Sequence, residues 1–114
     1  MAYKCSSDIV DSYATMHACI SDDYYSVYAS ITTKYNQYGE WNFYWKMELQ
    51  RYVTLSTWNT IDTRYGYVSE TSPSNRTFSN IGKYNDPMRL VIHYYNDSGY
   101  NEYLESQYVD GWYR

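Results

Sequence analysis

The feature that most constrains this chain is a long stretch, residues 41–58, in which apolar and polar side chains alternate. Its odd positions hold Trp41, Phe43, Trp45, Met47, Leu49, Arg51, Val53, Leu55 and Thr57. Successive side chains of a β-strand point to opposite sides of the sheet, so a period of two indicates a strand with one buried face. A straight strand of this length would span about 60 Å, whereas a domain of this size has a radius of gyration of roughly 13 Å. We therefore expect the stretch to bend, bulge or divide, most readily at Arg51, which interrupts the apolar side.

The same alternation recurs over shorter distances elsewhere in the chain. Residues 27–35 alternate, and the loop 36–40 has a length suited to a hairpin that pairs them with the following stretch. Weaker strand patterns occupy residues 64–69, 77–81, 88–95 and 100–109. We expect residues 96–99 to close a hairpin between the last two of these, and residues 110–111 to form one more turn.

The N-terminal third fits two interpretations. Ser7 is a suitable N-cap for a helix with apolar residues spaced along one side, namely Ile9, Val10, Tyr13, Met16 and Ile20. The same segment also fits a strand with Val10, Ala14, Met16, Ala18 and Ile20 on one face. We favour the strand, because residues 10–20 can then pair with residues 24–35 across a turn at Asp22 and Asp23.

These patterns together predict an all-β fold. Six to eight short strands without an internal repeat or a linker are typical of an antiparallel β-sandwich or a small barrel. One short N-terminal helix is the alternative element. We expect residues 1–114 to form a single tyrosine-rich β domain.

Composition supports a folded chain and argues against several kinds of partner. Of the 114 residues, 18 are Tyr and 4 are Trp, whereas disordered chains are poor in aromatic residues. No run of about 20 apolar residues is present to cross a membrane, and the net charge of -4 disfavours electrostatic binding of nucleic acid. No phosphate-binding glycine loop or catalytic motif occurs, so we expect no cofactor and regard an enzyme as the less favoured class. The oligomeric state is not predicted.

Cys5 and Cys19 are the only cysteines, and they form either a disulfide or two buried thiols. A bridge would close a loop of about 15 residues and stabilise the fold by roughly 3 kcal/mol. The abundance of Tyr, Ser, Thr and Asn and the scarcity of Lys and Glu favour a secreted or cell-surface protein in its mature form, with a cytoplasmic protein as the alternative. The disulfide is expected on condition that the protein is secreted. We expect no metal site, because two cysteines are too few and neither histidine is spaced to complete a zinc site.

The aromatic surplus is the main indication of function. The residues expected at the centre of the core are Trp41, Phe43, Trp45, Met47, Leu49, Val53 and Leu55. The even-numbered positions, on the opposite side of these strands, carry aromatic and polar side chains. We predict that these side chains line one exposed binding face: Tyr28, Tyr44, Tyr52, Trp58, Asn42 and Gln50. The alternative is that these tyrosines simply occupy two-faced strands, where their β-propensity is high.

Three functions are considered for this face and its neighbours. Exposed Tyr and Trp are preferred anchors of protein–protein contacts, so a protein partner is the first hypothesis, as for an inhibitor, effector or immunity protein. A glycan partner is the second, because aromatic rings stack on sugars while Asn42, Glu48 and Gln50 bind hydroxyls. The third rests on Glu48, Arg89 and His93 (with His17 as a second imidazole), which supply the base, phosphate-binding group and acid of a ribonuclease. In composition alone the chain resembles the small secreted guanyl-specific ribonucleases of fungi; the patterns around these residues differ from that family.

Overall fold

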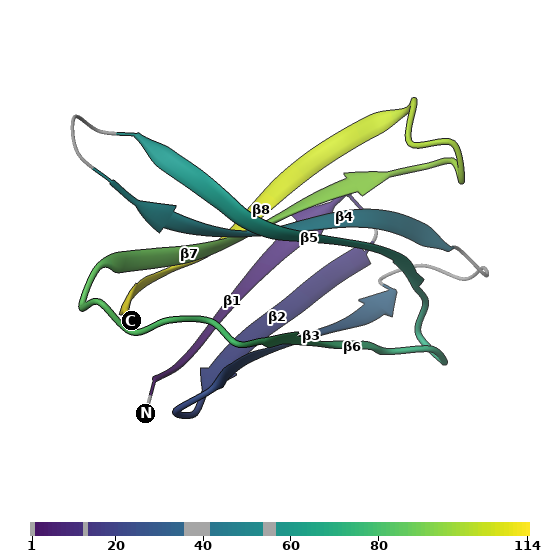
Figure 1. The fold of residues 1–114 in the computed structure, drawn as a ribbon. Coiled ribbons are helices and arrows are strands. Elements are labelled where there is room, and N and C mark those ends of the chain that lie inside the picture. Colours follow the sequence, from purple (N-terminus) through teal and green to yellow (C-terminus); the bar gives the residue numbers. More distant parts are fainter. Residues whose placement is uncertain (1, 13, 36–41, 54–56) are drawn as a thin grey trace.

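The computed structural model describes residues 2–12, 14–35, 42–53 and 57–114, which form a two-layer β-sandwich (Figure 1). The strands are β1 (Tyr3–Val10), β2 (Ala14–Asp22), β3 (Ser26–Tyr35), β4 (Phe43–Tyr52), β5 (Trp58–Val68), β6 (Ser74–Ser79), β7 (Pro87–Tyr95) and β8 (Tyr103–Tyr113). The first sheet has the order β1-β2-β3-β6 and the second sheet the order β5-β4-β7-β8. All neighbouring strands are antiparallel. The predicted all-β sandwich is confirmed.

The long alternating stretch divides into two strands, as its length requires. β4 ends at Tyr52 and β5 begins at Trp58, and these two residues face each other across the resulting hairpin. The register between the two strands shifts next to Leu49 and Gln50, so the pair also contains a bulge. The predicted break near Arg51 is therefore confirmed. None of the described residues belongs to a helix that could cross a membrane.

The predicted hairpin between residues 27–35 and the following stretch is wrong. β3 pairs with β2 and β6, whereas β4 pairs with β5 and β7, so the chain passes from one sheet to the other between β3 and β4. The expected hairpin loop, 36–40, lies outside the described residues. Both strands bury one face, for example Ile31 on β3 and Trp45 on β4. Alternation shows which side chains of a strand are buried. It does not show whether two such strands are neighbours in one sheet or lie in two sheets that face each other, because both arrangements bury the same side chains.

At the N-terminus the strand interpretation is confirmed, with an additional strand that the sequence pattern did not predict. β1 pairs with β2 residue by residue, from Tyr3 opposite Ser21 to Val10 opposite Ala14. The turn between them contains Asp11 and Ser12, with φ angles of 55° and 68°. Residues of this kind adopt positive φ only occasionally, so the turn lacks the glycine signal by which hairpins are usually found.

The C-terminal hairpin of β7 and β8 is confirmed, but the turn expected at residues 110–111 is a bulge inside β8. The pairing moves from Leu90 opposite Val109 to Met88 opposite Trp112, which leaves two residues of β8 facing one of β7. Gly111 has a φ of 79°, the conformation that the bulge requires and that glycine adopts without a steric penalty. The strand therefore continues to Tyr113.

The core is the layer of side chains between the two sheets. Of the residues predicted at its centre, Phe43, Trp45, Met47 and Leu49 are fully buried. Val53 is exposed, contrary to the prediction, because it lies beyond the end of β4; Trp41 and Leu55 lie outside the described residues. The other sheet supplies a matching apolar layer from β2, β3 and β6: Ala14, Met16, Ala18, Ile20, Val27, Ala29, Ile31 and Phe78. Burying each large side chain contributes about 1.5–3 kcal/mol.

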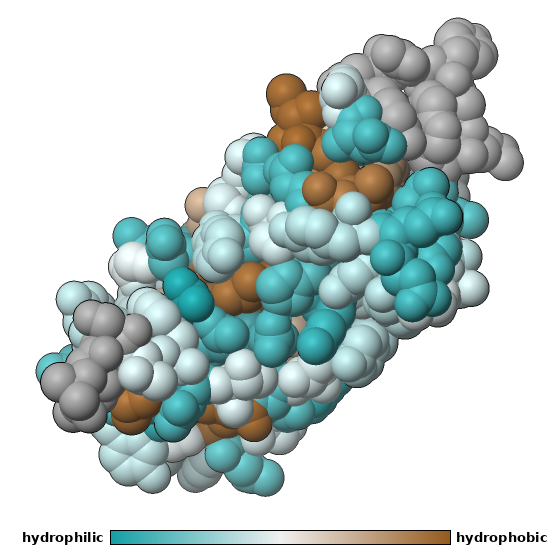
Figure 2. Space-filling view, turned by 90° about the horizontal axis from the view of Figure 1, so that it is seen from above, coloured by the Kyte–Doolittle hydropathy of each residue, from teal (hydrophilic) through white to brown (hydrophobic). Residues whose placement is uncertain are grey.

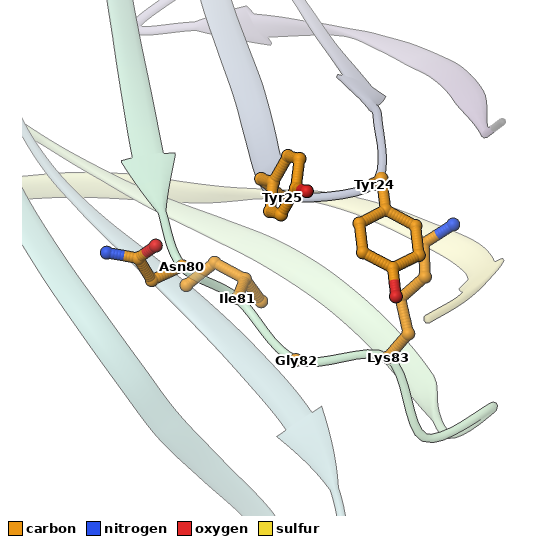
Figure 3. A pocket seen from close by; sticks show the side chains of 6 residues that line it. All are labelled: Tyr24, Tyr25, Asn80, Ile81, Gly82 and Lys83. Carbon is orange, nitrogen blue, oxygen red and sulfur yellow. The ribbon is translucent and has the colours of Figure 1, made fainter.

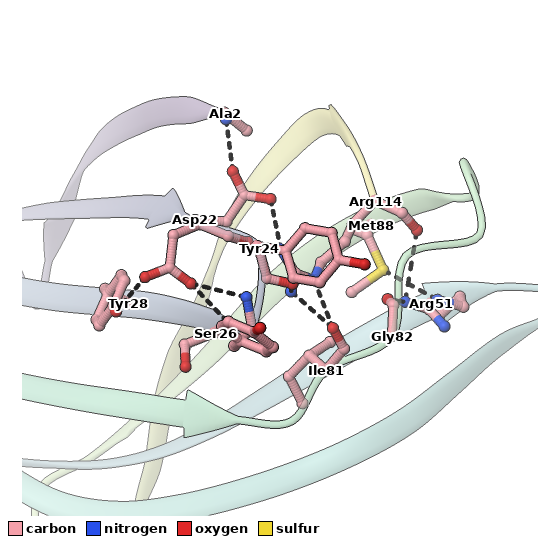
Figure 4. A network of polar contacts seen from close by, with 12 residues as sticks. Ala2, Asp22, Tyr24, Ser26, Tyr28, Arg51, Ile81, Gly82, Met88 and Arg114 are labelled. Carbon is pink, nitrogen blue, oxygen red and sulfur yellow. Dashed lines mark hydrogen bonds and ion pairs between the residues drawn. The ribbon is translucent and has the colours of Figure 1, made fainter.

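A buried network at Arg114 joins several segments at one end of the sandwich (Figure 4). Its guanidinium donates to the carboxylate of Asp22 at 2.8 Å and twice to the carbonyl of Ile81, at 2.6 and 3.0 Å. Further bonds reach the carbonyls of Asp23 and Tyr24 in the turn between β2 and β3. The side chain is completely buried, so all of these groups are satisfied inside the protein rather than by water.

Candidate binding face

The outward side of the second sheet gathers most of the residues predicted for a binding face. Tyr44, Gln50 and Tyr52 lie on β4, and Trp58 faces Tyr52 from β5. Asn42 is exposed just before β4. Tyr28, in contrast, lies on the outer side of the first sheet, because β3 and β4 are not neighbours. The structure therefore brings the second-sheet residues together and separates Tyr28 from them.

Several tyrosines that the sequence pattern did not single out complete this surface. We call it the aromatic face and define it by its rings: Tyr44, Tyr52, Trp58, Tyr65, Tyr67, Tyr95, Tyr100, Tyr103 and Tyr108. Figure 2, seen from above Figure 1, shows a mixture of pale and teal residues on this side with separate brown patches. Tyr is drawn pale because its hydropathy index is mildly hydrophilic despite its large ring. The parity of Tyr65 and Tyr67 around Gly66 was visible in the sequence, but not which strand lies beside them.

Tyr100 is the centre of one half of the face. Its ring lies 5.1 Å from that of Tyr65 and 5.3 Å from that of Tyr95, in edge-to-face orientation. Tyr44 contacts the same ring at 6.4 Å, also edge to face. Aromatic pairs prefer this geometry, which adds about 0.5–1.5 kcal/mol to the effect of burial. The cluster therefore has fixed ring positions before any partner binds.

The loop between β7 and β8 places Tyr100 over the sheet. Tyr100 has a positive φ of 57°. One carboxylate oxygen of Asp97 accepts hydrogen bonds from the backbone N–H groups of Asn101 and Glu102, at 2.9 and 2.8 Å. These bonds to the charged form hold the pKa of Asp97 below its usual value. Burial, with a contribution from Tyr65, raises the pKa of the Tyr100 hydroxyl, which therefore stays neutral.

The other half of the face is organised by Arg89 on β7. Its guanidinium lies 4.2 Å from the ring centre of Trp58 and 5.2 Å from that of Tyr108. Its Nε donates to Oε1 of Gln50 at 2.7 Å. The ring of Trp58 also meets that of Tyr52 edge to face at 5.4 Å. Cation–π contacts of this kind contribute about 0.5–2 kcal/mol and fix the arginine side chain.

A chain of hydrogen bonds crosses the middle of the face. His93 Nε2 lies 2.6 Å from Oε2 of Glu48, and His93 Nδ1 lies 2.7 Å from Oγ of Ser106. Thr60 donates to the other oxygen of Glu48 at 3.2 Å. Partial burial acts to raise the pKa of Glu48, but the hydrogen bonds from His93 and Thr60 outweigh it and lower the pKa. Glu48 is therefore an anion whose two oxygens are already bound.

The nuclease hypothesis is met only in part by this arrangement. Glu48 and His93 are in contact, as a base and an acid should be. Arg89 lies on the same face of β7, but its guanidinium is held by Gln50 and two aromatic rings rather than beside His93. His17 lies on the other sheet. The ribonuclease reading stays a prediction.

Three hollows of the described surface lie away from the aromatic face. One of about 270 Å³ is formed by the turn before β3 and the segment after β6, and is lined by Tyr24, Tyr25, Asn80, Ile81, Gly82 and Lys83 (Figure 3). The side chains of Tyr24 and Lys83 lie along one edge, with the ammonium 5.7 Å from the ring centre. A second hollow adjoins Asp22 and Arg114, and the third opens beside Cys19. In the first, the backbone N–H of Ile81 is already bonded to the carbonyl of Tyr25.

Cys5 and Cys19 form the predicted disulfide, which links β1 to β2 on the outer side of the first sheet. The bridge is consistent with an extracellular protein. The expectation that neither histidine is spaced to complete a zinc site with these cysteines stays a prediction. His17 lies two residues before Cys19 on the same face of β2, with its Nε2 3.3 Å from Sγ of Cys19. Spacing of two along a strand brings side chains together, which a search for known zinc spacings does not detect.

Comparison with known families and with curated proteins finds no match to this chain.

Proposed function

We propose that this chain is a small binding protein whose aromatic face engages a protein partner. The observation that carries this proposal is the gathering of nine exposed or half-buried rings on one side of the second sheet, with Arg89 held between Trp58 and Tyr108. Tyr, Trp and Arg are the residue types that contribute most to protein–protein binding energy. Because the rings are fixed by mutual contacts, little conformational entropy is lost when a partner binds.

The polar groups of the face favour a protein over a glycan. Sugar recognition needs side chains with free hydrogen-bonding capacity to bind hydroxyls. Gln50 already accepts from Arg89 and donates to Thr60, and both oxygens of Glu48 are bonded to its neighbours. What the face offers a ligand is therefore mainly ring surface, which suits the core of a protein interface.

The location that we propose for this activity is outside the cell or at its surface. The Cys5–Cys19 bridge supports this, because disulfides persist in oxidising compartments. The scarcity of Lys and Glu in the sequence is a second, compositional argument.

Site-specific photo-crosslinking tests the protein partner. A benzophenone amino acid is placed at Tyr67 or Tyr103, which are 53% and 57% exposed on the aromatic face, and the protein is irradiated together with the surface and secreted proteins of the cells that produce it. We expect one discrete protein adduct from each position. Excess unlabelled protein should compete for it, and a variant with Tyr65→Ser, Tyr67→Ser and Tyr103→Ser should not.

The matched control places the same photo-reactive group at Tyr3, which is 70% exposed on the first sheet. Identical adducts from Tyr3 and Tyr67, or no adduct from the aromatic face, would contradict the proposal.

A glycan is the second candidate, favoured by the open rings of Tyr65, Tyr67 and Tyr103. Trp58 reports on this face, whereas Trp45 and Trp112 are buried in the core. Titration with soluble glycans should change the tryptophan fluorescence of the wild type and leave that of Trp58→Phe unchanged. No change with any glycan would remove this candidate.

A further inference from the structure

The outer side of the first sheet carries a second cluster of reactive groups, independent of the aromatic face. Cys5 and Cys19 are directly opposite each other in the β1–β2 pair, with Cα atoms 4.0 Å apart. His17 lies beside them, and the sulfur and imidazole nitrogen atoms of the three residues all lie within 4.8 Å of one another. Cys5 and His17 are exposed, so the cluster is open to solvent.

We propose that reduction of the Cys5–Cys19 bridge converts this cluster into a binding site for zinc or a similar soft divalent cation. A dithiol or phosphine reductant supplies two electrons; the S–S bond breaks and each sulfur takes up one proton. The cation then displaces these two protons and binds both thiolates and the His17 imidazole. In the oxidised protein neither sulfur is a thiolate, so the site exists only after reduction.

The spacing of the three ligands suits tetrahedral coordination. With bonds of about 2.3 Å to sulfur and about 2.0 Å to nitrogen, ligand atoms on one zinc lie roughly 3.5–3.8 Å apart. His17 Nε2 is 3.3 Å from Sγ of Cys19 in the bridged protein. Once the bond is cut, rotation about the two Cα–Cβ bonds separates the sulfurs, while the paired strands keep the backbone positions fixed. Two thiolates and one imidazole leave a fourth position for water or an external ligand.

Ser7 is placed to orient the imidazole. Its Oγ lies 2.9 Å from Nδ1 of His17. When Nε2 binds a cation, Nδ1 must carry the proton, and Nδ1–H then donates a hydrogen bond to the Ser7 hydroxyl oxygen. In the bridged protein Sγ of Cys19 carries no proton, so a hydrogen bond between Sγ and Nε2 requires the proton to be on Nε2, and the Ser7 hydroxyl then donates to Nδ1. A serine serves both tautomers, because a hydroxyl is donor and acceptor.

A hollow of about 250 Å³ gives access to the cluster. It opens beside Cys19 and is bordered by Tyr3 on β1, Tyr28 on β3 and Asn75 on β6. The hydroxyl of Tyr3 lies 3.8 Å from Sγ of Cys19. A reductant, a cation and a fourth ligand can therefore reach the sulfur without any strand moving.

Cobalt(II) titration tests the site, since Co²⁺ replaces zinc and gives visible spectra. We expect thiolate-to-cobalt charge-transfer bands from the phosphine-reduced protein, saturating at one cation per chain, and none from the oxidised protein. His17→Ala should weaken Co²⁺ binding at least tenfold and Ser7→Ala by a smaller factor. Thr32→Ala, at the cross-strand neighbour of His17, should bind as the wild type does.

Three results would overturn the proposal: no charge-transfer band from reduced protein, equal binding by His17→Ala, or equal binding by oxidised protein. Far-UV circular dichroism accompanies each titration. If reduction unfolds the chain, recovery of the β signal on adding Co²⁺ supports the site, and failure to recover it counts against the site.

Discussion

At the scale of single residues, Arg114 makes the clearest prediction. Its guanidinium is fully buried and paired with Asp22, whose side chain is 4% exposed. Breaking a buried ion pair from one side leaves the other charge uncompensated, which costs about 3–5 kcal/mol. Arg114→Met should therefore lower the free energy of unfolding by about that amount, measured by urea denaturation.

The matched control is Arg64, which pairs with Asp62 at 2.6 Å while its side chain is 33% exposed. Partly exposed pairs contribute about 0–1 kcal/mol, so Arg64→Met should cost far less. Adding Asp22→Asn to Arg114→Met should recover part of the loss. If Arg64→Met and Arg114→Met lower the free energy of unfolding equally, the buried network does not stabilise this end of the sandwich as predicted.

At the scale of elements, Gly66 on β5 decides how closely β5 approaches the core. It pairs with Trp45, and a Cβ at this position would lie 2.5 Å from Cζ2 of Trp45 and 2.7 Å from Nη2 of Arg76. Trp45 is fully buried and bonded to Ser74, so it cannot move aside. Gly66→Ala should lower the free energy of unfolding by about 1–3 kcal/mol in thermal or urea denaturation.

Gly111 provides the comparison, because nothing lies within 4 Å of the Cβ position there. Its positive φ is one that Asn tolerates, so Gly111→Asn should cost under about 1 kcal/mol. A loss for Gly66→Ala no larger than that for Gly111→Asn would contradict the prediction that contact with Trp45 limits the residue at position 66.

The elements also show what the sequence can and cannot predict. The alternation from Phe43 to Leu49 identified the buried stripe, because burial depends on the period of the chain itself. The pairing of β3 and β4 was mispredicted, since the choice between neighbouring strand and facing sheet depends on contacts far apart in sequence. Strand parity placed Tyr44 and Tyr52 on the binding face. Parity could not place Tyr100, because Tyr100 reaches the face from a loop whose conformation is fixed by Asp97.

At the scale of the whole molecule, the two sheets are joined along β1 and β8. Gln107 on β8 is buried and donates to the backbone and side-chain oxygens of Ser6 and to the carbonyl of Met16. Its own oxygen accepts a hydrogen bond from Tyr94 at 2.7 Å. The Gln107 amide is buried, and all of its groups are bonded to residues of the two sheets. Directional hydrogen bonds of this kind fix the relative position of the sheets more specifically than apolar contacts do.

The same seam predicts how stability depends on pH. Burial, together with the hydrogen bond and repulsion from Asp8 on β1, raises the pKa of Glu105 from 4.5 to about 7. A carboxyl group with a raised pKa in the folded state contributes its stabilisation fully below 4.5 and loses it as the pH rises through about 7. The melting temperature should therefore fall between pH 5 and pH 8.

Glu105→Gln keeps a neutral donor beside Asp8 and should remove most of this fall, so that the variant is the more stable protein at pH 8. Glu102→Gln, at an exposed position in the preceding loop, should keep the wild-type slope, and an unchanged slope in Glu105→Gln would assign the pH dependence to other groups.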